Sequence, residues 1–166
     1  MVNHIETKRL SITALTPGQL ELWINDIPML EKELGCSYQA EPMKGVFKEI
    51  AAGQLELAKN AGENYIWYSF WFMIRKSDNV VVGSADFKNL PDKNGEVEIG
   101  YGLGKAFEHC GYMTETVQAM CDWARKQKGV RHIIAETDID GYASQRILRR
   151  CGFKEYKRDT TVWWRL

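Results

Sequence analysis

The sequence of 166 residues predicts a single α+β domain, with a mixed, mostly antiparallel sheet between layers of helices. Three observations predict this class. Apolar segments at 64–75 and 80–87 flank the turn Ser77-Asp78-Asn79, which is typical of a β-hairpin. Two later strands are each followed by a helical pattern, which is typical of a crossover to a neighbouring strand. The length is sufficient to bury a core without disulfides or a metal ion.

The first half of the chain predicts one strand and two helices before the hairpin. Residues 6–15 alternate as a strand, and Thr16-Pro17-Gly18-Gln19 then predicts a capping box, with Pro17 at the first helical position. Pro28 predicts the end of this helix or a kink in it. Residues 42–61 predict the second helix.

The second half predicts alternating strands and helices. The expected elements are a strand at 95–103, a helix at 113–128, a strand at 130–137, a helix at 141–151, and two short strands at 153–158 and 161–166. The predicted sheet therefore has about seven strands.

A glycine turn connects the strand at 95–103 to the following helix. Gly111 lies just before this helix, which begins near Thr114. The first N–H groups of a helix are free, its dipole is positive there, and a glycine lets the backbone approach a ligand closely. A phosphate-bearing cofactor is the functional interpretation, and an ordinary strand-to-helix connection is the alternative.

Two segments of the sequence resemble the paired signature of the GNAT superfamily of N-acetyltransferases. The cofactor-pyrophosphate loop of that superfamily corresponds to Glu108–Glu115, which reads EHCGYMTE. A later N-x-x-S-x-R-x-L-x-x-x-G-F segment is matched by Gly141, Ser144, Arg146, Leu148, Gly152 and Phe153. These forms, together with the opening IETKRLSITALTPGQL, are similar to the Rim-like branch, which contains the ribosomal-protein N-terminal acetyltransferases. The resemblance covers nearly the whole chain.

The resemblance implies one GNAT-like domain over residues 1–166, with its sheet splayed between the fourth and fifth strands. It implies an enzyme that transfers acetyl from acetyl-CoA directly to a primary amine, on a small molecule or a protein N-terminus. We expect the cofactor to contact Tyr101, Gly102, Leu103, His109, Cys110, Gly111, Tyr112, Met113, Thr114, Gly141 and Ser144. The helices at 17–27 and 42–61 correspond to one wall of the acceptor cleft.

Acyl transfer to an amine needs a proton acceptor, because an ammonium has no lone pair. The candidates are Glu96 and Glu98, on the polar face of their strand, and Glu136, at the position of the catalytic glutamate in the branch that the chain resembles. Ser144 is the candidate acid beside the cofactor sulfur, since Leu148 occupies the place where many relatives have a tyrosine. Solvation of the glutamates and capping of the helix by Ser144 are the structural alternatives.

The glycines of the strand at 95–103 suggest where the sheet opens. Gly100, Gly102 and Gly104 are typical of a bulge that admits the pantetheine arm. Backbone N–H groups of Gly102 and Leu103 are then the expected donors to the oxyanion.

Two residues depart from the pattern of the superfamily. Glu108 stands where the loop usually has Arg or Gln, and Gly141 stands where Asn is common. Both departures predict weaker cofactor binding. They keep open a non-catalytic acyl-CoA-binding module that senses the cofactor. An enzyme that uses a longer acyl-CoA is a separate alternative.

Composition excludes several other classes. The 22 basic and 22 acidic residues balance, and the pI is near 6.8, so we expect no nucleic-acid partner. The cluster of Arg146, Arg149, Arg150 and Lys154 is either a solvated helix face or a contact for the nucleotide end of coenzyme A. The four cysteines lack metal spacing, and no leader or spanning segment is present, so we expect a soluble cytoplasmic protein without a metal. A monomer and a homodimer are both open, and the acceptor amine is not identified.

Overall fold

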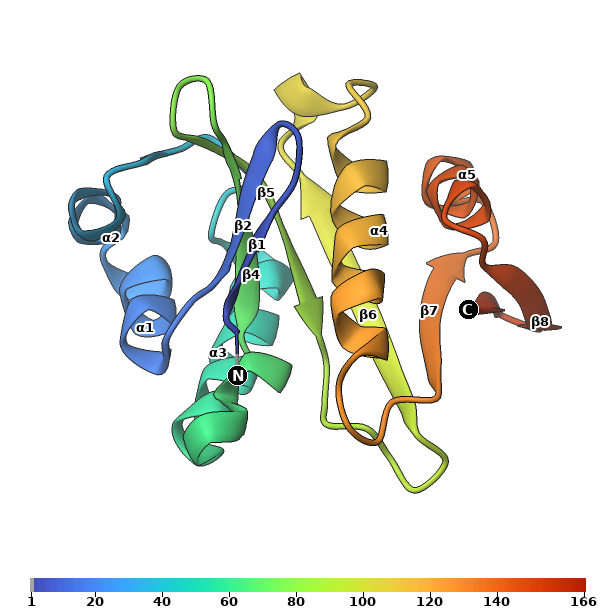
Figure 1. Cartoon of the computed structure of the whole chain (residues 1–166). Helices are drawn as coiled ribbons and strands as arrows, with labels where there is room; N and C mark the ends of the chain where they lie inside the picture. Colours follow the sequence, from blue (N-terminus) through green and yellow to red (C-terminus); the bar gives the residue numbers. More distant parts are fainter. Residues whose placement is uncertain (1) are drawn as a thin grey trace.

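The computed structural model describes residues 2–166, which form a mixed sheet with helices on both faces (Figure 1). The main path of the sheet runs through β1 (His4–Glu6), β2 (Leu10–Ala14), β4 (Phe70–Arg75), β5 (Val80–Phe87), β6 (Glu96–Leu103), β7 (His132–Asp138), β9 (Thr161–Arg165) and β8 (Lys154–Arg158). β6 pairs in parallel with β7, and β3 (Ser37–Tyr38) pairs in parallel with β5, whereas the other neighbours are antiparallel. The predicted fold class is confirmed.

The sheet has nine strands within residues 2–166 rather than about seven. The predicted strand at 6–15 is a hairpin of β1 and β2, because the Thr7 N–H donates to the Leu10 carbonyl and closes a turn. The predicted strand at 64–75 starts too early, since Gly62–Trp67 forms a short 3₁₀ helix, η1. The Ile66 carbonyl of η1 accepts a hydrogen bond from the indole N–H of Trp71 at 3.2 Å, which holds η1 against β4. The side chain of Trp67 is therefore buried although its backbone is not extended.

The helices follow the predicted order. They are α1 (Pro17–Asn25), α2 (Ile27–Leu34), α3 (Gly45–Lys59), α4 (Tyr112–Arg125) and α5 (Tyr142–Arg150), with a short η2 (Lys105–Phe107). The capping box of α1 is confirmed, since Thr16 and Gln19 each accept a backbone N–H of the other. Pro28 ends this helix as predicted, because Asp26 caps a new helix with Pro28 in its first turn. Within the described chain, none of the helices has the length and apolar character needed to cross a bilayer.

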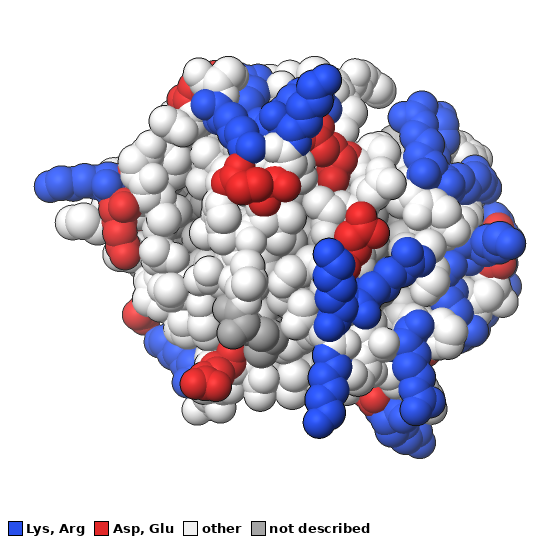
Figure 2. Space-filling view, viewed as in Figure 1, with Lys and Arg blue, Asp and Glu red and all other residues white. Residues whose placement is uncertain are grey.

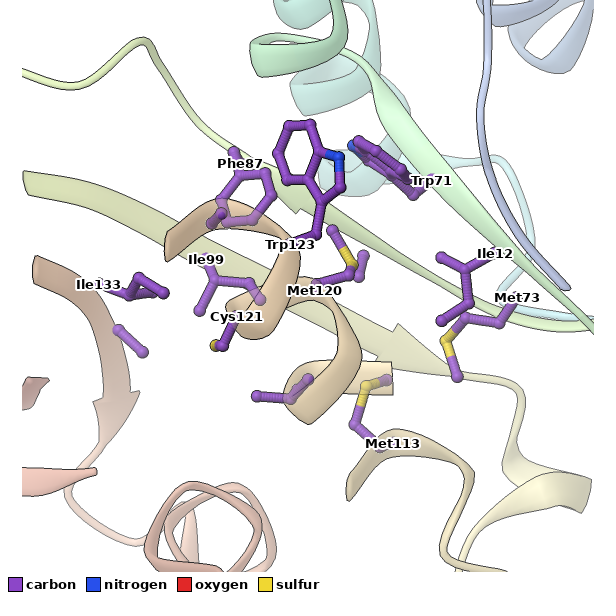
Figure 3. Close-up of a cluster of buried hydrophobic side chains, with 14 of the residues drawn as sticks. Ile12, Trp71, Met73, Phe87, Ile99, Met113, Met120, Cys121, Trp123 and Ile133 are labelled. Atoms are coloured by element: carbon purple, nitrogen blue, oxygen red, sulfur yellow. The ribbon is translucent and has the colours of Figure 1, made fainter. Parts of the chain in front are cut away.

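Two hydrophobic cores hold the helices on opposite faces of the sheet. Trp23 of α1 is fully buried among the aromatic residues of the α1–α3 face. On the other face, Trp123 of α4 packs with its ring centroid 5.1 Å from that of Trp71 and 5.8 Å from that of Phe87 (Figure 3). Met113, near the start of α4, is 3% exposed in the same core. This packing fixes the N-terminus of α4 beside the end of β6.

Candidate active site

The sheet opens between β6 and β7, which are the fourth and fifth of the predicted strands. Their parallel register runs only from Glu96 opposite His132 to Glu98 opposite Ile134. Beyond Glu98, β6 continues beside β5, whereas β7 continues beside β9. The predicted splay is confirmed. The predicted glycine bulge is wrong, since β5 and β6 stay in register as far as Leu103, and the gap arises because β6 and β7 diverge.

The β5–β6 ladder decides which backbone groups face this gap. The Gly104 N–H donates to the Val82 carbonyl at 2.9 Å, and the Lys88 N–H donates to the Glu98 carbonyl at 3.0 Å. Bonded and non-bonded residues alternate along an antiparallel pair. The N–H of Gly102 therefore faces β5, which corrects its prediction as an oxyanion donor. The N–H groups of Tyr101 and Leu103 face the gap.

A first cavity of about 270 Å³ lies between the end of β6, the start of α4 and the start of α5. Of the predicted cofactor residues, those that line it are Tyr101, Gly102, Leu103, His109, Gly111, Met113, Thr114 and Ser144. Cys110, Tyr112 and Gly141 do not line it.

The N-terminus of α4 forms one end of this cavity. Gly111 is the N-cap, with a left-handed φ of 80° and no side-chain hydrogen bond at the cap. The first N–H groups of the helix, those of Tyr112, Met113 and Thr114, are left free by the helical hydrogen-bond pattern. His109 also has a positive φ, 64°, so two left-handed residues shape the turn. This arrangement suits an anion.

Cys110 and Tyr112 hold the loop from behind. The Cys110 carbonyl accepts from Arg9 Nη1 at 2.8 Å, and the Arg9 guanidinium lies 4.4 Å from the Tyr112 ring centroid. Glu115 accepts from the Thr7 hydroxyl and from both the backbone N–H and Nε of Arg9. Burial alone would raise the pKa of Glu115, but these hydrogen bonds outweigh it and lower that pKa. The N-terminal hairpin thus positions the loop.

Charged side chains also line the first cavity. Arg146 and Arg150, one turn apart on α5, line this cavity. Glu108, the first departure from the superfamily pattern, lines it as well. Arg149 instead lies over the Trp164 ring, 4.9 Å from its centroid. Figure 2 shows Lys and Arg gathered on the side of the molecule where Figure 1 places α5 and β8.

Gly141, the second departure, is the N-cap of α5. A Cβ added there would lie 3.2 Å from the Asp138 carbonyl oxygen, so a side chain at this position requires the backbone to shift slightly. An asparagine is therefore not freely accommodated.

A second cavity, of about 300 Å³, lies on the α1–α3 face of the sheet. Phe47 and Ile50 of α3 form an apolar wall, and residues of β5, β6 and β7 form the floor. Tyr101, Gly102 and Ser144 line both cavities. The two cavities therefore meet where β6 and β7 diverge.

The predicted proton acceptors differ in position. Glu136 lines the second cavity. Glu98 lines neither cavity and accepts from Lys88 Nζ at 2.6 Å. Ser144 lies at the junction, and Tyr101 donates its hydroxyl hydrogen to the Ser144 carbonyl at 3.3 Å.

Two further carboxylates in the second cavity were missed by the sequence analysis. Asp86 of β5 is 6% exposed, and burial raises its pKa to about 6. Asp86 could have been recognised from the sequence, because it is an acidic residue within the apolar strand VVVGSADF. Glu41, in the loop before α3, gave no such signal. Its Oε2 lies 3.1 Å from where a Cβ on Gly102 would be.

Comparisons with known proteins identify the family of this chain. A sequence model of the acetyltransferase (GNAT) domain matches residues 37–154. The chain is 31% identical over 150 residues to the uncharacterized N-acetyltransferase YjdG of Bacillus subtilis, covering 84% of this chain and 88% of that protein.

Solved structures share the fold. RimL, a ribosomal L7/L12 α-N-protein acetyltransferase in complex with coenzyme A, has a TM-score of 0.69 at 15% identity, covering 98% of this chain and 97% of that chain. The ribosomal-protein-S5-alanine acetyltransferase from Vibrio fischeri has a TM-score of 0.69 at 15% identity, covering 98% and 95%. The resemblance to the Rim-like branch is confirmed at the level of the fold. The chain belongs to the GNAT family and is an N-acetyltransferase.

Proposed function

We propose that the protein transfers acetyl from acetyl-CoA directly to a primary amine. The observation that carries this proposal is the junction of the two cavities at Tyr101, Gly102 and Ser144. A thioester held in the first cavity and an amine held in the second would meet there without an acyl-enzyme. Acetyl-CoA, when bound, supplies the activated acyl group and the thiolate leaving group.

The residues of the first cavity fit coenzyme A. The free N–H groups at the start of α4 suit the pyrophosphate, because they combine unpaired donors with the positive end of the helix dipole. Arg146 and Arg150 supply positive charge for further phosphate, and they offset the carboxylate of Glu108. The N–H groups of Tyr101 and Leu103 can pair with the amides of the pantetheine arm or with the developing oxyanion.

In our proposal Glu136 accepts the proton of the amine, directly or through water. An alkylammonium has an ordinary pKa of about 10.4, so at neutral pH this proton must be removed before attack. The amine nitrogen bonds to the acyl carbon to give a tetrahedral oxyanion, and its collapse breaks the carbon–sulfur bond. The departing thiolate takes up a proton from the Ser144 hydroxyl, which receives in turn the second proton that the nitrogen loses. Glu136 is preferred to Glu98 because it lines the acceptor cavity, whereas Glu98 is paired with Lys88.

The test is thiol release from acetyl-CoA across a panel of primary amines, beside calorimetry of acetyl-CoA binding. We expect amine-dependent release from the unmodified protein. Glu136→Gln should lower kcat by about a hundredfold, with a smaller loss at high pH and little change in acetyl-CoA affinity. Glu63→Gln, at an exposed position of η1, is the matched control.

Three outcomes would contradict the proposal. Tight acetyl-CoA binding without amine-dependent release would instead support a sensor. Full turnover at neutral pH in Glu136→Gln, Glu98→Gln and the double variant would refute the carboxylate mechanism. Faster release from a longer acyl-CoA than from acetyl-CoA would reassign the acyl group.

A further inference from the structure

Asp86 is a buried carboxylate that the transfer mechanism does not use. It is 6% exposed, and it lines the second cavity beside Ser84 and Lys88 of the same strand face. Within residues 2–166 its oxygens accept no hydrogen bond and form no ion pair. Burial raises its pKa, the positive charge of Lys88 opposes this rise, and the negative charge of Glu98 adds to it. Buried carboxylates are ordinarily paired or hydrogen-bonded. The Asp86 oxygens thus face the cavity without a partner.

The glycines of β6 make room for this carboxylate and for a second one. A Cβ on Gly100 would lie 2.8 Å from Asp86 Oδ1, and a Cβ on Gly102 would lie 3.1 Å from Glu41 Oε2. Gly100 and Gly102 lie on the same face of β6, about 7 Å apart along the strand. Gly102 belongs to both cavities, whereas Gly100 belongs only to the second. Glu41 therefore lies at the transfer junction, and Asp86 lies away from it.

The second cavity has an excess of negative charge. Glu41, Asp86 and Glu136 line it, whereas Lys88 is the one cation among its lining residues within the described part of the chain. The Nζ of Lys88 is bound to Glu98 at 2.6 Å. Phe47 and Ile50 of α3 form an apolar wall opposite the sheet, and Phe70 of β4 lies directly beside Asp86 on the neighbouring strand. Carboxylates facing an apolar wall fit an aliphatic chain with cationic ends.

We propose that the acceptor is a small aliphatic diamine or polyamine, and that Asp86 binds the ammonium that is not acetylated. This proposal rests on the proposed function. The reacting nitrogen lies near Gly102 and Ser144, and the second nitrogen lies over Gly100. The second nitrogen keeps its proton, because an alkylammonium is charged at neutral pH. A separation of about 7 Å matches a chain of four or five methylenes.

An acceptor with a single amino group provides no second ammonium to bind Asp86. A monoamine, including the single α-amino group of a protein N-terminus, would leave Asp86 buried and unpaired. An amino acid that placed its carboxylate beside Asp86 would add like-charge repulsion. The carboxylates therefore select for a second positive charge.

The first experiment measures thiol release from acetyl-CoA with three acceptors of one length: 1,5-diaminopentane, 1-aminopentane and 5-aminopentanoate. We expect kcat/KM for the diamine to exceed that for 1-aminopentane by about tenfold to a hundredfold, and 5-aminopentanoate to be the poorest acceptor. Asp86→Asn should remove most of this preference by lowering the value for the diamine far more than that for the monoamine. Asp122→Asn, exposed on α4, is the matched control.

The second experiment needs no turnover. The diamine and the monoamine are titrated by calorimetry into the protein saturated with coenzyme A, and into Asp86→Asn treated identically. Equal binding of the two amines, or equal binding to the two proteins, would overturn the diamine proposal. Amine-dependent thiol release would then still support the proposed function. Diamine binding that depends on Asp86, without thiol release from any amine, would establish the cation site and refute the proposed function.

Discussion

Replacing Asp86 with asparagine should stabilise the fold at neutral and alkaline pH. The carboxylate is 6% exposed on β5, and burial raises its pKa from the ordinary value of 3.8 to about 6. The folded chain therefore holds the Asp86 proton more tightly than the unfolded chain does. The contribution of Asp86 to the free energy of unfolding is therefore fully present below pH 3.8 and is lost as the pH rises through about 6.

The size of the effect follows from these two pKa values. At 1.36 kcal/mol for each pH unit between 3.8 and about 6, ionising Asp86 costs the folded state about 3 kcal/mol above pH 7. Asparagine has nearly the shape of the protonated acid and carries no charge. Near pH 4, Asp86→Asn should therefore unfold at about the same urea concentration as the wild type. At pH 8 its free energy of unfolding should be higher than that of the wild type by about 2–3 kcal/mol.

The assay is urea unfolding of the wild type, Asp86→Asn and the exposed control Asp122→Asn, at intervals from pH 4 to pH 8. The difference in free energy of unfolding between Asp86→Asn and the wild type should grow with pH, while Asp122→Asn keeps the stability of the wild type at each pH. A difference that stays constant with pH, or an Asp86→Asn protein less stable at pH 8, would refute this reasoning. A more stable variant that discriminates diamines poorly would show that this carboxylate is kept for binding.

Three other predictions concern the first cavity and the residues that anchor its loop. Gly111→Val should weaken coenzyme A binding by about tenfold in calorimetry, since a φ of 80° disfavours a β-branched residue; unchanged affinity would remove this loop from the phosphate site. Ser144→Ala should lower kcat by about a hundredfold with little change in acetyl-CoA affinity, and the opposite pattern would make it a binding residue. Glu115→Gln should lower the free energy of unfolding by about 1–3 kcal/mol in urea at pH 7, because Thr7 and Arg9 lose a charged acceptor. Those hydrogen bonds lower the pKa of Glu115, so the wild type should lose this stabilisation as the pH falls below 4.5, and equal stability of the two proteins at pH 7 would contradict the anchoring role.

The sequence by itself determined most of the order and type of the elements, because these depend on neighbours in the chain. Thr16 and Gln19 form the capping box that their spacing predicts, and Pro28 begins a new helix. Gly111 takes the left-handed conformation at the start of α4 for the same local reason. One exception is Gly62–Trp67, where Ile66 and Trp67 are buried in a 3₁₀ helix rather than in a strand. Burial of an aromatic side chain does not specify its backbone.

Only the tertiary structure decided how the site is assembled. The gap beside Tyr101 exists because β6 and β7 follow different partners after Glu98, and pairing between distant strands is not encoded in either strand alone. The same holds for the carboxylates. Asp86 lies over Gly100 and Glu41 over Gly102 because a neighbouring strand and a loop bring them there. The charge of a carboxylate depends on the groups that surround it in space, so the acidic second cavity became visible only in the folded chain.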